Sequence, residues 1–238
     1  MFSHQGRNRT LKHNLRIATI LSFVAGIVNV TGFLFLGQLT TNVTGHFAQF
    51  MNELLRIQPK HSLVYLLYIL SFLLGATFSG IMMDRGRRLS KQNIYQTPLI
   101  LEGMILICLP ILLMIGLSLK DDMVACILLF SMGMQNSYVT HLSGAVVRTT
   151  HLTGLFTDLG IEISQWINSK LHPNTRKVKA MIKLRVRIIF SFFAGGIIGG
   201  LCYFKLSMEL STLLLGGIVL VISMLYDHHS NMKNRVHL

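Results

Sequence analysis

The sequence predicts an all-α polytopic membrane protein whose six transmembrane helices form two inverted-topology repeats of three helices. Three observations support this prediction. Of the 238 residues, 51% are hydrophobic and only 13% are charged, against roughly a quarter charged in soluble domains. Six apolar runs are each about long enough to cross a bilayer as a helix. Finally, two motifs recur in the same order in both halves of the chain.

The predicted elements follow one another in a regular order. The six spans are 17–39, 63–83, 98–119, 123–139, 188–204 and 210–225, of which the fourth and the last are short. After the first span and again after the fourth, an amphipathic stretch too short to span the membrane follows, at 46–55 and 154–166. Each repeat therefore contains three spans and one short broken or interfacial helix.

The charge of the chain indicates its orientation. Lys and Arg number 22 against 9 Asp and Glu, a net charge of +13. With the N-terminus in the cytoplasm, 18 of these cations fall inside and only Arg56, Lys60, Lys120 and Lys205 fall outside. The positive-inside rule explains such a bias. We therefore expect cytoplasmic N- and C-termini and no nucleic-acid partner.

Two pairs of segments establish the repeat. Residues 40–47 and 149–156 share Thr, Thr, Thr, Gly and Phe at the same five places. Residues 71–80 and 191–200 both end in two small residues, two others and two small residues. A duplication explains the shared order, with 1–119 and 120–238 as the two repeats of one integral membrane domain. Because three spans is an odd number, the two repeats would cross the membrane in opposite senses.

The first pair of segments contains two candidate helix starts, at Thr44-Gly45 and Thr153-Gly154. We expect Thr44 and Thr153 to act as N-caps. Free backbone N–H groups at such starts suit anions or carbonyl oxygens, and non-helical backbone inside a bilayer must be buried by protein or line a cavity. Two breaks facing each other near the midplane would form a solute site. The alternative is that they only cap interfacial helices.

Polar residues inside spans are candidates for solute binding because their burial in lipid is costly. Asn29 and Asn136 occupy equivalent positions of the two repeats, and hydrogen bonding between helices is the alternative role. Arg148 is expected either to bind an anionic group or to serve orientation. The candidate solute-binding residues are Asn29, Thr31, Thr41, Thr44, Gly45, Gln135, Asn136, Arg148, Thr150, Thr153 and Gly154.

Other residues are assigned structural roles. Small residues let helices approach closely, and the predicted packing residues are Gly75, Ala76, Ser79, Gly80, Gly195, Gly196, Gly199 and Gly200. Self-association into a homo-oligomer is an alternative use of the same residues. Glu102 is expected to be stabilised at a helix start, with proton coupling as the alternative. Cys108, Cys126 and Cys202 are expected to be small buried hydrophobic residues.

Catalytic motifs are missing from the sequence. It contains no GxSxG, HExxH, CxxC or Walker pattern. We therefore expect no enzymatic activity, no cofactor and no metal site. The expected partners are the lipid bilayer and a small solute that the sequence does not identify.

The order of these motifs resembles the YoaK family of uncharacterised bacterial inner-membrane proteins. The resemblance covers about 15–225 and is sharpest at Gly-Met-Gln-Asn (133–136) and Arg-Thr-Thr-x-x-Thr-Gly (148–154). It implies a six-span fold in a bacterial plasma membrane and gives no substrate. The family often has an acidic residue in place of Asn29, and Thr-Gly-Asn in place of Thr44-Gly45-His46. If that acid couples proton movement in relatives, this chain would lack the coupling or achieve it in another way.

The predicted function is that of a secondary transporter (permease) for a small polar or anionic solute, bound at the interface of the two repeats. A channel or facilitator is the first alternative, since broken helices also build pores. A membrane module that scaffolds or regulates a partner is the second, since the basic segment 170–187 could bind anionic lipid or an acidic protein.

Overall fold

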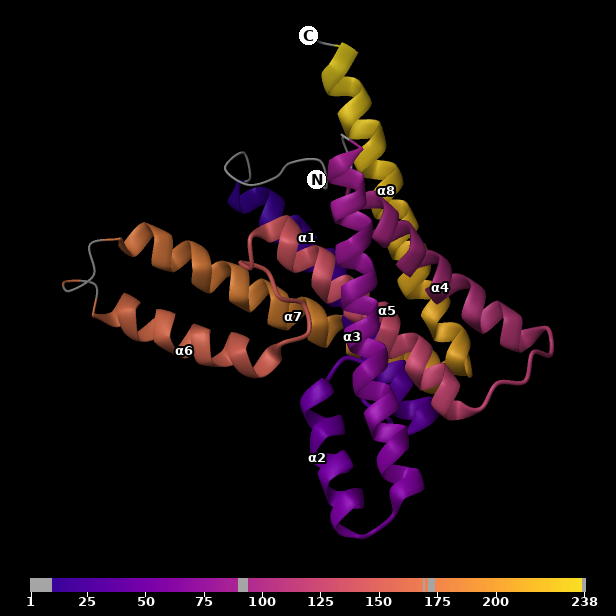
Figure 1. Ribbon diagram of the computed structural model, residues 1–238. Coiled ribbons are helices and arrows are strands. Elements are labelled where there is room, and N and C mark those ends of the chain that lie inside the picture. Colours follow the sequence, from indigo (N-terminus) through magenta and orange to yellow (C-terminus); the bar gives the residue numbers. More distant parts are fainter. Residues whose placement is uncertain (1–9, 90–93, 169, 171–173, 237–238) are drawn as a thin grey trace.

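The computed structural model describes residues 10–89, 94–168, 170 and 174–236, and this part of the chain is entirely helical, without strands. Its elements are α1 (Leu11–Leu36), α2 (Val43–Leu55), α3 (Pro59–Arg88), α4 (Gln96–Met114), α5 (Asp121–Ser143), α6 (Leu152–Ile167), α7 (Thr175–Lys205), the short 3-10 helix η2 (Glu209–Thr212) and α8 (Leu213–Val236). Figure 1 shows the arrangement.

Six helical segments are long and apolar enough to cross a membrane, namely α1, α3, α4, α5, α7 and Glu209–Asp227. They coincide with the six predicted spans, so the chain is a multi-pass membrane protein. The cytoplasmic location of its termini stays a prediction, and the first nine and last two residues lie outside the described part.

The helices differ from the predicted spans at several ends, and the third span ends at Met114 instead of residue 119. Two of the differences have a clear physical reason. The first span ends at Leu36 instead of residue 39, because Gly37 adopts a left-handed conformation (φ 68°) and its N–H donates to the carbonyl of Phe33. The fifth span begins at Thr175 instead of residue 188. Its extra N-terminal turns are rich in Lys and Arg, which favour helix as much as apolar residues do. The Lys and Arg residues before residue 188 therefore limit the apolar part of α7, but they do not end the helix.

The centre of the bundle is formed by α1 and α5, the two most deeply buried spans. Leu21, Val24 and Val28 of α1 and Leu128 and Met132 of α5 are fully buried in the main hydrophobic core. Large apolar side chains on the outer faces of α3, α4 and α7 are instead exposed. In a membrane protein, lipid covers such faces.

The helices pack in a recurring set of pairs. α1 lies against α7, and α3 lies against α5. α2 covers α3, and α6 covers α7, so that two helical hairpins project from the bundle (Figure 1). α4 contacts both α5 and α8, and α8 also contacts α1.

Candidate functional site

The first break is the non-helical segment 37–42 between α1 and α2, and it folds back onto α1. Thr40 is fully buried, and its hydroxyl donates to the backbone carbonyl of Val28 at 2.9 Å. The hydroxyl of Thr41 donates to Oδ1 of Asn29 at 2.7 Å. The Thr-Thr pair therefore attaches the break to the middle of the preceding span and fixes the orientation of the Asn29 amide.

The second break, between α5 and α6, repeats these contacts with one change. The hydroxyl of Thr150 donates to Oδ1 of Asn136 at 2.9 Å. Nε2 of Gln135 donates to the hydroxyl of Thr149 at 2.8 Å and to the carbonyl of Leu21 on α1 at 3.0 Å. In both halves, then, the second threonine of the pair binds the equivalent asparagine, and Gln135 adds a link between the halves.

The predicted N-caps are wrong. Asn42 is the N-cap of α2, and its Oδ1 accepts hydrogen bonds from the N–H groups of Thr44 and Gly45 at 2.9 and 3.4 Å. The N-cap of α6 is His151, without a side-chain cap. Both helices thus begin before the predicted threonines, and Thr44 and Thr153 are exposed in the first turns of α2 and α6.

A cluster of rings joins α2 to α3. The buried His46 contacts the carbonyl of Leu39 through Nε2 at 2.7 Å. Its ring centroid lies 5.1 Å from that of Tyr68 and 6.2 Å from that of Tyr65. Tyr68 in turn donates a short hydrogen bond to Asp122 at the start of α5. Burial lowers the pKa of His46 below its ordinary value of 6.5, although the bond to the Leu39 carbonyl opposes this shift.

Four glycines form the closest contacts between spans. A Cβ at Gly26 of α1 would lie 2.1 Å from the carbonyl oxygen of Phe192, and one at Gly195 of α7 would lie 2.0 Å from that of Phe23. These two reciprocal contacts leave no room for any side chain at either glycine.

The same reciprocal contact joins α3 and α5. A Cβ at Gly75 would lie 2.0 Å from the carbonyl oxygen of Phe130, and one at Gly133 would lie 2.1 Å from that of Phe72. In all four helices the contacted Phe stands three residues before the glycine. This Phe-x-x-Gly repetition was available in the sequence, but the prediction used only the small residues.

The other predicted packing residues differ in their surroundings. Ser79 is buried, and Gly199 lies close to Val30 and Ile27. Ala76 is partly buried, and Gly196 and Gly200 lie at the edge of the contact with α1, where the nearest atoms to an added Cβ are 3.8 Å away. Gly80 faces open space, since a Cβ there would meet nothing within 4 Å.

A hollow of about 460 Å³ lies where the two halves of the chain meet. The first half contributes α1 and Leu39, and the second half contributes the start of α6 and one face of α7. Asn29 is the polar side chain of its wall, and its Nδ2 donates to no other described residue. The lining residues are Gly26, Asn29, Val30, Phe33, Leu39, Leu152, Phe156, Ile189, Phe192, Phe193, Gly196 and Ile197.

The predicted solute-binding residues are thus only partly brought together. Asn29 lines the hollow, and Thr41 holds it there. Asn136 instead donates through Nδ2 to the carbonyl of Met132 on its own helix, at 2.8 Å. Arg148 is exposed and lies outside the lining of the hollow. Four further candidates, Thr44, Gly45, Thr153 and Gly154, belong to the first turns of α2 and α6.

Several buried polar atoms have no hydrogen-bond partner among the described residues. They include the hydroxyl of Thr31 and Oε1 of Gln135, two of the predicted site residues. Oε1 of Glu102 is a third, while its Oε2 accepts from the hydroxyl of Tyr138 at 2.5 Å. This fully buried pair ties α4 to α5 and was not predicted, because 36 residues separate its members.

Cys108, Cys126 and Cys202 are free, but the expectation that they are buried is wrong: Cys126 and Cys202 are only partly buried, and Cys108 is exposed. It lies on a face of α4 that also exposes Met104 and Ile111, so its surroundings would be lipid. No group of three or more His, Cys, Asp or Glu side chains suited to a metal ion is found within the described ranges.

One comparison with known proteins gives a match. A family described as "protein of unknown function (DUF1275)" matches residues 17–226, nearly the whole chain. Searches of the curated proteins and of the solved structures gave no match.

Proposed function

Because the chain belongs to the DUF1275 family, the YoaK-like membrane proteins that its motifs resemble, it inherits no assigned activity, and we propose one from its own geometry. The proposed function is that of a secondary transporter for a small solute. The observation that carries this proposal is the hollow lined by both halves of the chain, with the Asn29 amide on its wall.

The packing supports two inverted repeats. Exchanging α1 with α5, α2 with α6, α3 with α7 and α4 with α8 maps the contacts among these helices onto one another with one exception: α3 contacts α4, whereas α7 contacts η2 ahead of α8. The reciprocal glycine contacts and the two Thr–Asn hydrogen bonds follow the same exchange. Since three spans separate equivalent helices, such an exchange relates segments of opposite direction across the membrane, as in many transporters.

The lining of the hollow favours a particular kind of solute. The Thr41 hydroxyl occupies Oδ1 of Asn29, so the amide offers its Nδ2 donor. Most other lining residues are aromatic or aliphatic, and none is charged. A solute with an apolar body and an oxygen acceptor therefore fits better than a multiply charged anion, whose burial there would be unpaired.

The difference between the two asparagines suggests how transport would proceed. Asn29 faces the hollow, whereas Asn136 binds the carbonyl of its own helix. Rocking of one repeat against the other would exchange these two states. In the second state, Asn136 and Ala76 would take the places that Asn29 and Gly196 occupy in the present hollow.

A ligand screen tests the proposal. Purified protein is heated with individual small metabolites, and the unfolding temperature is compared among the wild type, Asn29→Ala and the control Asn52→Ala. Asn52 is exposed on α2 and does not line the hollow. A ligand at 100 times its Kd stabilises the native state by about 2.7 kcal/mol.

We expect a solute whose stabilisation persists in Asn52→Ala and disappears in Asn29→Ala. Liposomes loaded with that solute should then show saturable uptake and counterflow. A stabilising solute that binds Asn29→Ala as well as the wild type would refute the site. Flux without saturation or counterflow would indicate a channel instead of a carrier.

A further inference from the structure

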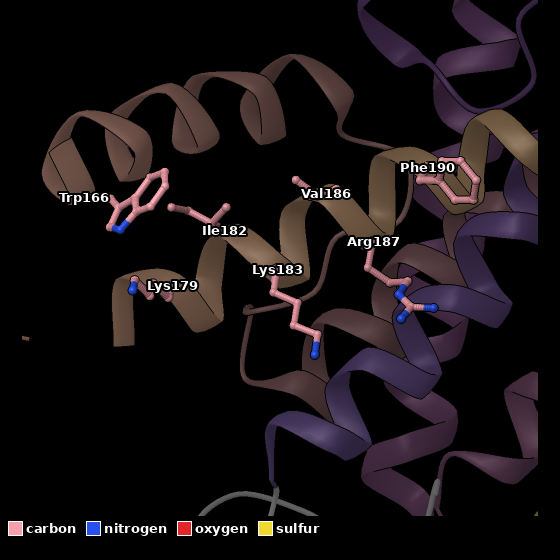
Figure 2. A pocket seen from close by; sticks show the side chains of 7 residues that line it. All are labelled: Trp166, Lys179, Ile182, Lys183, Val186, Arg187 and Phe190. Carbon is pink, nitrogen blue, oxygen red and sulfur yellow. The ribbon is translucent and has the colours of Figure 1, made fainter. Parts of the chain in front are cut away.

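A second hollow, of about 720 Å³, lies between the end of α6 and the first turns of α7. Figure 2 shows Trp166 on α6 above Lys179 and beside Ile182 of α7. This hollow, called the groove below, is lined on α7 by two parallel stripes of side chains, one cationic and one apolar. The cationic stripe is Lys179, Lys183 and Arg187, and the apolar stripe is Ile182, Val186 and Phe190.

The spacing of these stripes follows from the helix. Residues four apart stand one above the other on a helix face, so three cations form one line and three apolar side chains form the neighbouring line. The ammonium group of Lys179 lies 5.8 Å from the centre of the Trp166 ring, a cation–π contact that closes the outer end of the groove.

Within the described ranges, Lys179, Lys183 and Arg187 form no ion pair with an acidic residue. Only two acidic residues, Asp158 and Glu162, occur between 152 and 187. Both bind Arg185 on another face of α7, at 3.0 and 3.1 Å. The groove thus keeps a concentrated positive charge that these carboxylates do not neutralise.

The depth of the groove matches the lipid headgroups. Arg187 and Lys205 flank the apolar part of α7, and the 18 residue steps from one to the other rise about 27 Å, close to the thickness of a hydrocarbon core. With the apolar part of α7 in the hydrocarbon core, Lys183, one turn beyond Arg187, would stand at the level of the lipid phosphates. Phe190 begins the apolar part, and tryptophan is typical of this interface.

We propose that this groove binds one anionic phospholipid, with its phosphate between Lys183 and Arg187 and an acyl chain along the apolar stripe of α7. Arg187 can contact two phosphate oxygens at once, and Lys183 adds a point charge. The apolar stripe and Trp166 offer the acyl chain of the lipid an apolar surface, which a soluble phosphate would not use. The site shares no lining residue with the Asn29 hollow, so this proposal does not rest on transport.

The chain offers a built-in probe, because Trp166 is its only tryptophan. Full-length protein is reconstituted in phosphatidylcholine vesicles containing a small, equal fraction of either brominated phosphatidylglycerol or brominated phosphatidylcholine. Bromine quenches nearby tryptophan fluorescence. We expect the anionic lipid to quench Trp166 more strongly and to saturate at a lower fraction.

Two double variants test the contribution of the cations. Lys183→Gln/Arg187→Gln removes two cations of the groove, and Arg176→Gln/Lys177→Gln removes two exposed cations of the first turn of α7, which do not line it. At about fivefold per cation near an anionic surface, the groove variant should need about 30-fold more phosphatidylglycerol for half-maximal quenching. The control variant should keep the wild-type response.

Three outcomes would overturn the proposal. Equal quenching of wild-type Trp166 by the two brominated lipids would show that the groove does not select anionic lipid, and this result needs no variant to fold. If the control variant lost as much quenching by phosphatidylglycerol as the groove variant, general surface charge would explain the effect. An oligoglutamate peptide that changes Trp166 fluorescence where phosphatidylglycerol does not would assign the groove to an acidic protein partner.

Discussion

Replacing Gly26 by alanine tests the packing on which both halves depend. The added Cβ would lie 2.1 Å from the carbonyl oxygen of Phe192 and 2.9 Å from the backbone nitrogen of Gly196. Both neighbours are backbone atoms of α7, so no side chain can turn aside to make room. The two helices must separate, and the contacts along α1 and α7 are weakened together.

The size of the effect follows from two opposing contributions. Overpacking of a core costs typically about 1–3 kcal/mol, and a backbone clash this close lies at the upper end. Alanine returns up to about 1 kcal/mol as a better helix former than glycine. The net loss should be about 2 kcal/mol, which lowers the unfolding temperature by about 4–8 °C for a chain of this size.

The assay is thermal unfolding of purified protein, with Gly133→Ala and Gly80→Ala beside Gly26→Ala. Gly133 makes the equivalent contact on α5 and should give the same loss, whereas Gly80 has nothing within 4 Å and should give no loss or a small gain. If Gly26→Ala unfolded at the same temperature as Gly80→Ala, the proposed close contact of α1 and α7 would be wrong.

Three further predictions use the same unfolding assay. Tyr138→Phe removes the described hydrogen-bond partner of the buried Glu102 carboxyl and should cost about 1–3 kcal/mol; adding Glu102→Leu should recover part of this loss, and no recovery would contradict the pairing. Burial lowers the pKa of His46 from 6.5, so the neutral ring stabilises the fold above pH 6.5, and this contribution is lost as the pH falls through the lowered pKa. His46→Gln should therefore flatten the fall in unfolding temperature that acid causes. An unchanged slope would refute this prediction. Thr150→Val should cost about 1 kcal/mol through its lost hydrogen bond, while Thr153→Val, at an exposed position, should cost little; equal effects would contradict the difference.

The sequence predicted the six spans and the equivalence of the two motifs, because apolar length and shared order are local signals. The equivalence of Asn29 and Asn136 in particular reappears as two equivalent hydrogen bonds. The N-caps could not be chosen, because Asn42 and Thr44 are both good caps and the path of the chain selects between them.

Contacts between distant segments could not be predicted from the sequence. The Glu102–Tyr138 pair and the link from Gln135 to Leu21 join residues of different helices, whose relative positions depend on the whole bundle. The placing of Arg148 outside the hollow has the same origin. The Phe-x-x-Gly pattern was a readable signal for helix contacts, although not for which helices meet.

The proposed rocking of the two repeats can be tested directly in liposomes. After replacement of the three cysteines, spin labels are attached at Phe33 and Phe156, across the hollow, and in a second sample at their equivalents Thr140 and Phe47. The account predicts two distances for each pair and opposite shifts of the two pairs when solute is added. One fixed distance for each pair, unchanged by a solute that binds, would contradict it.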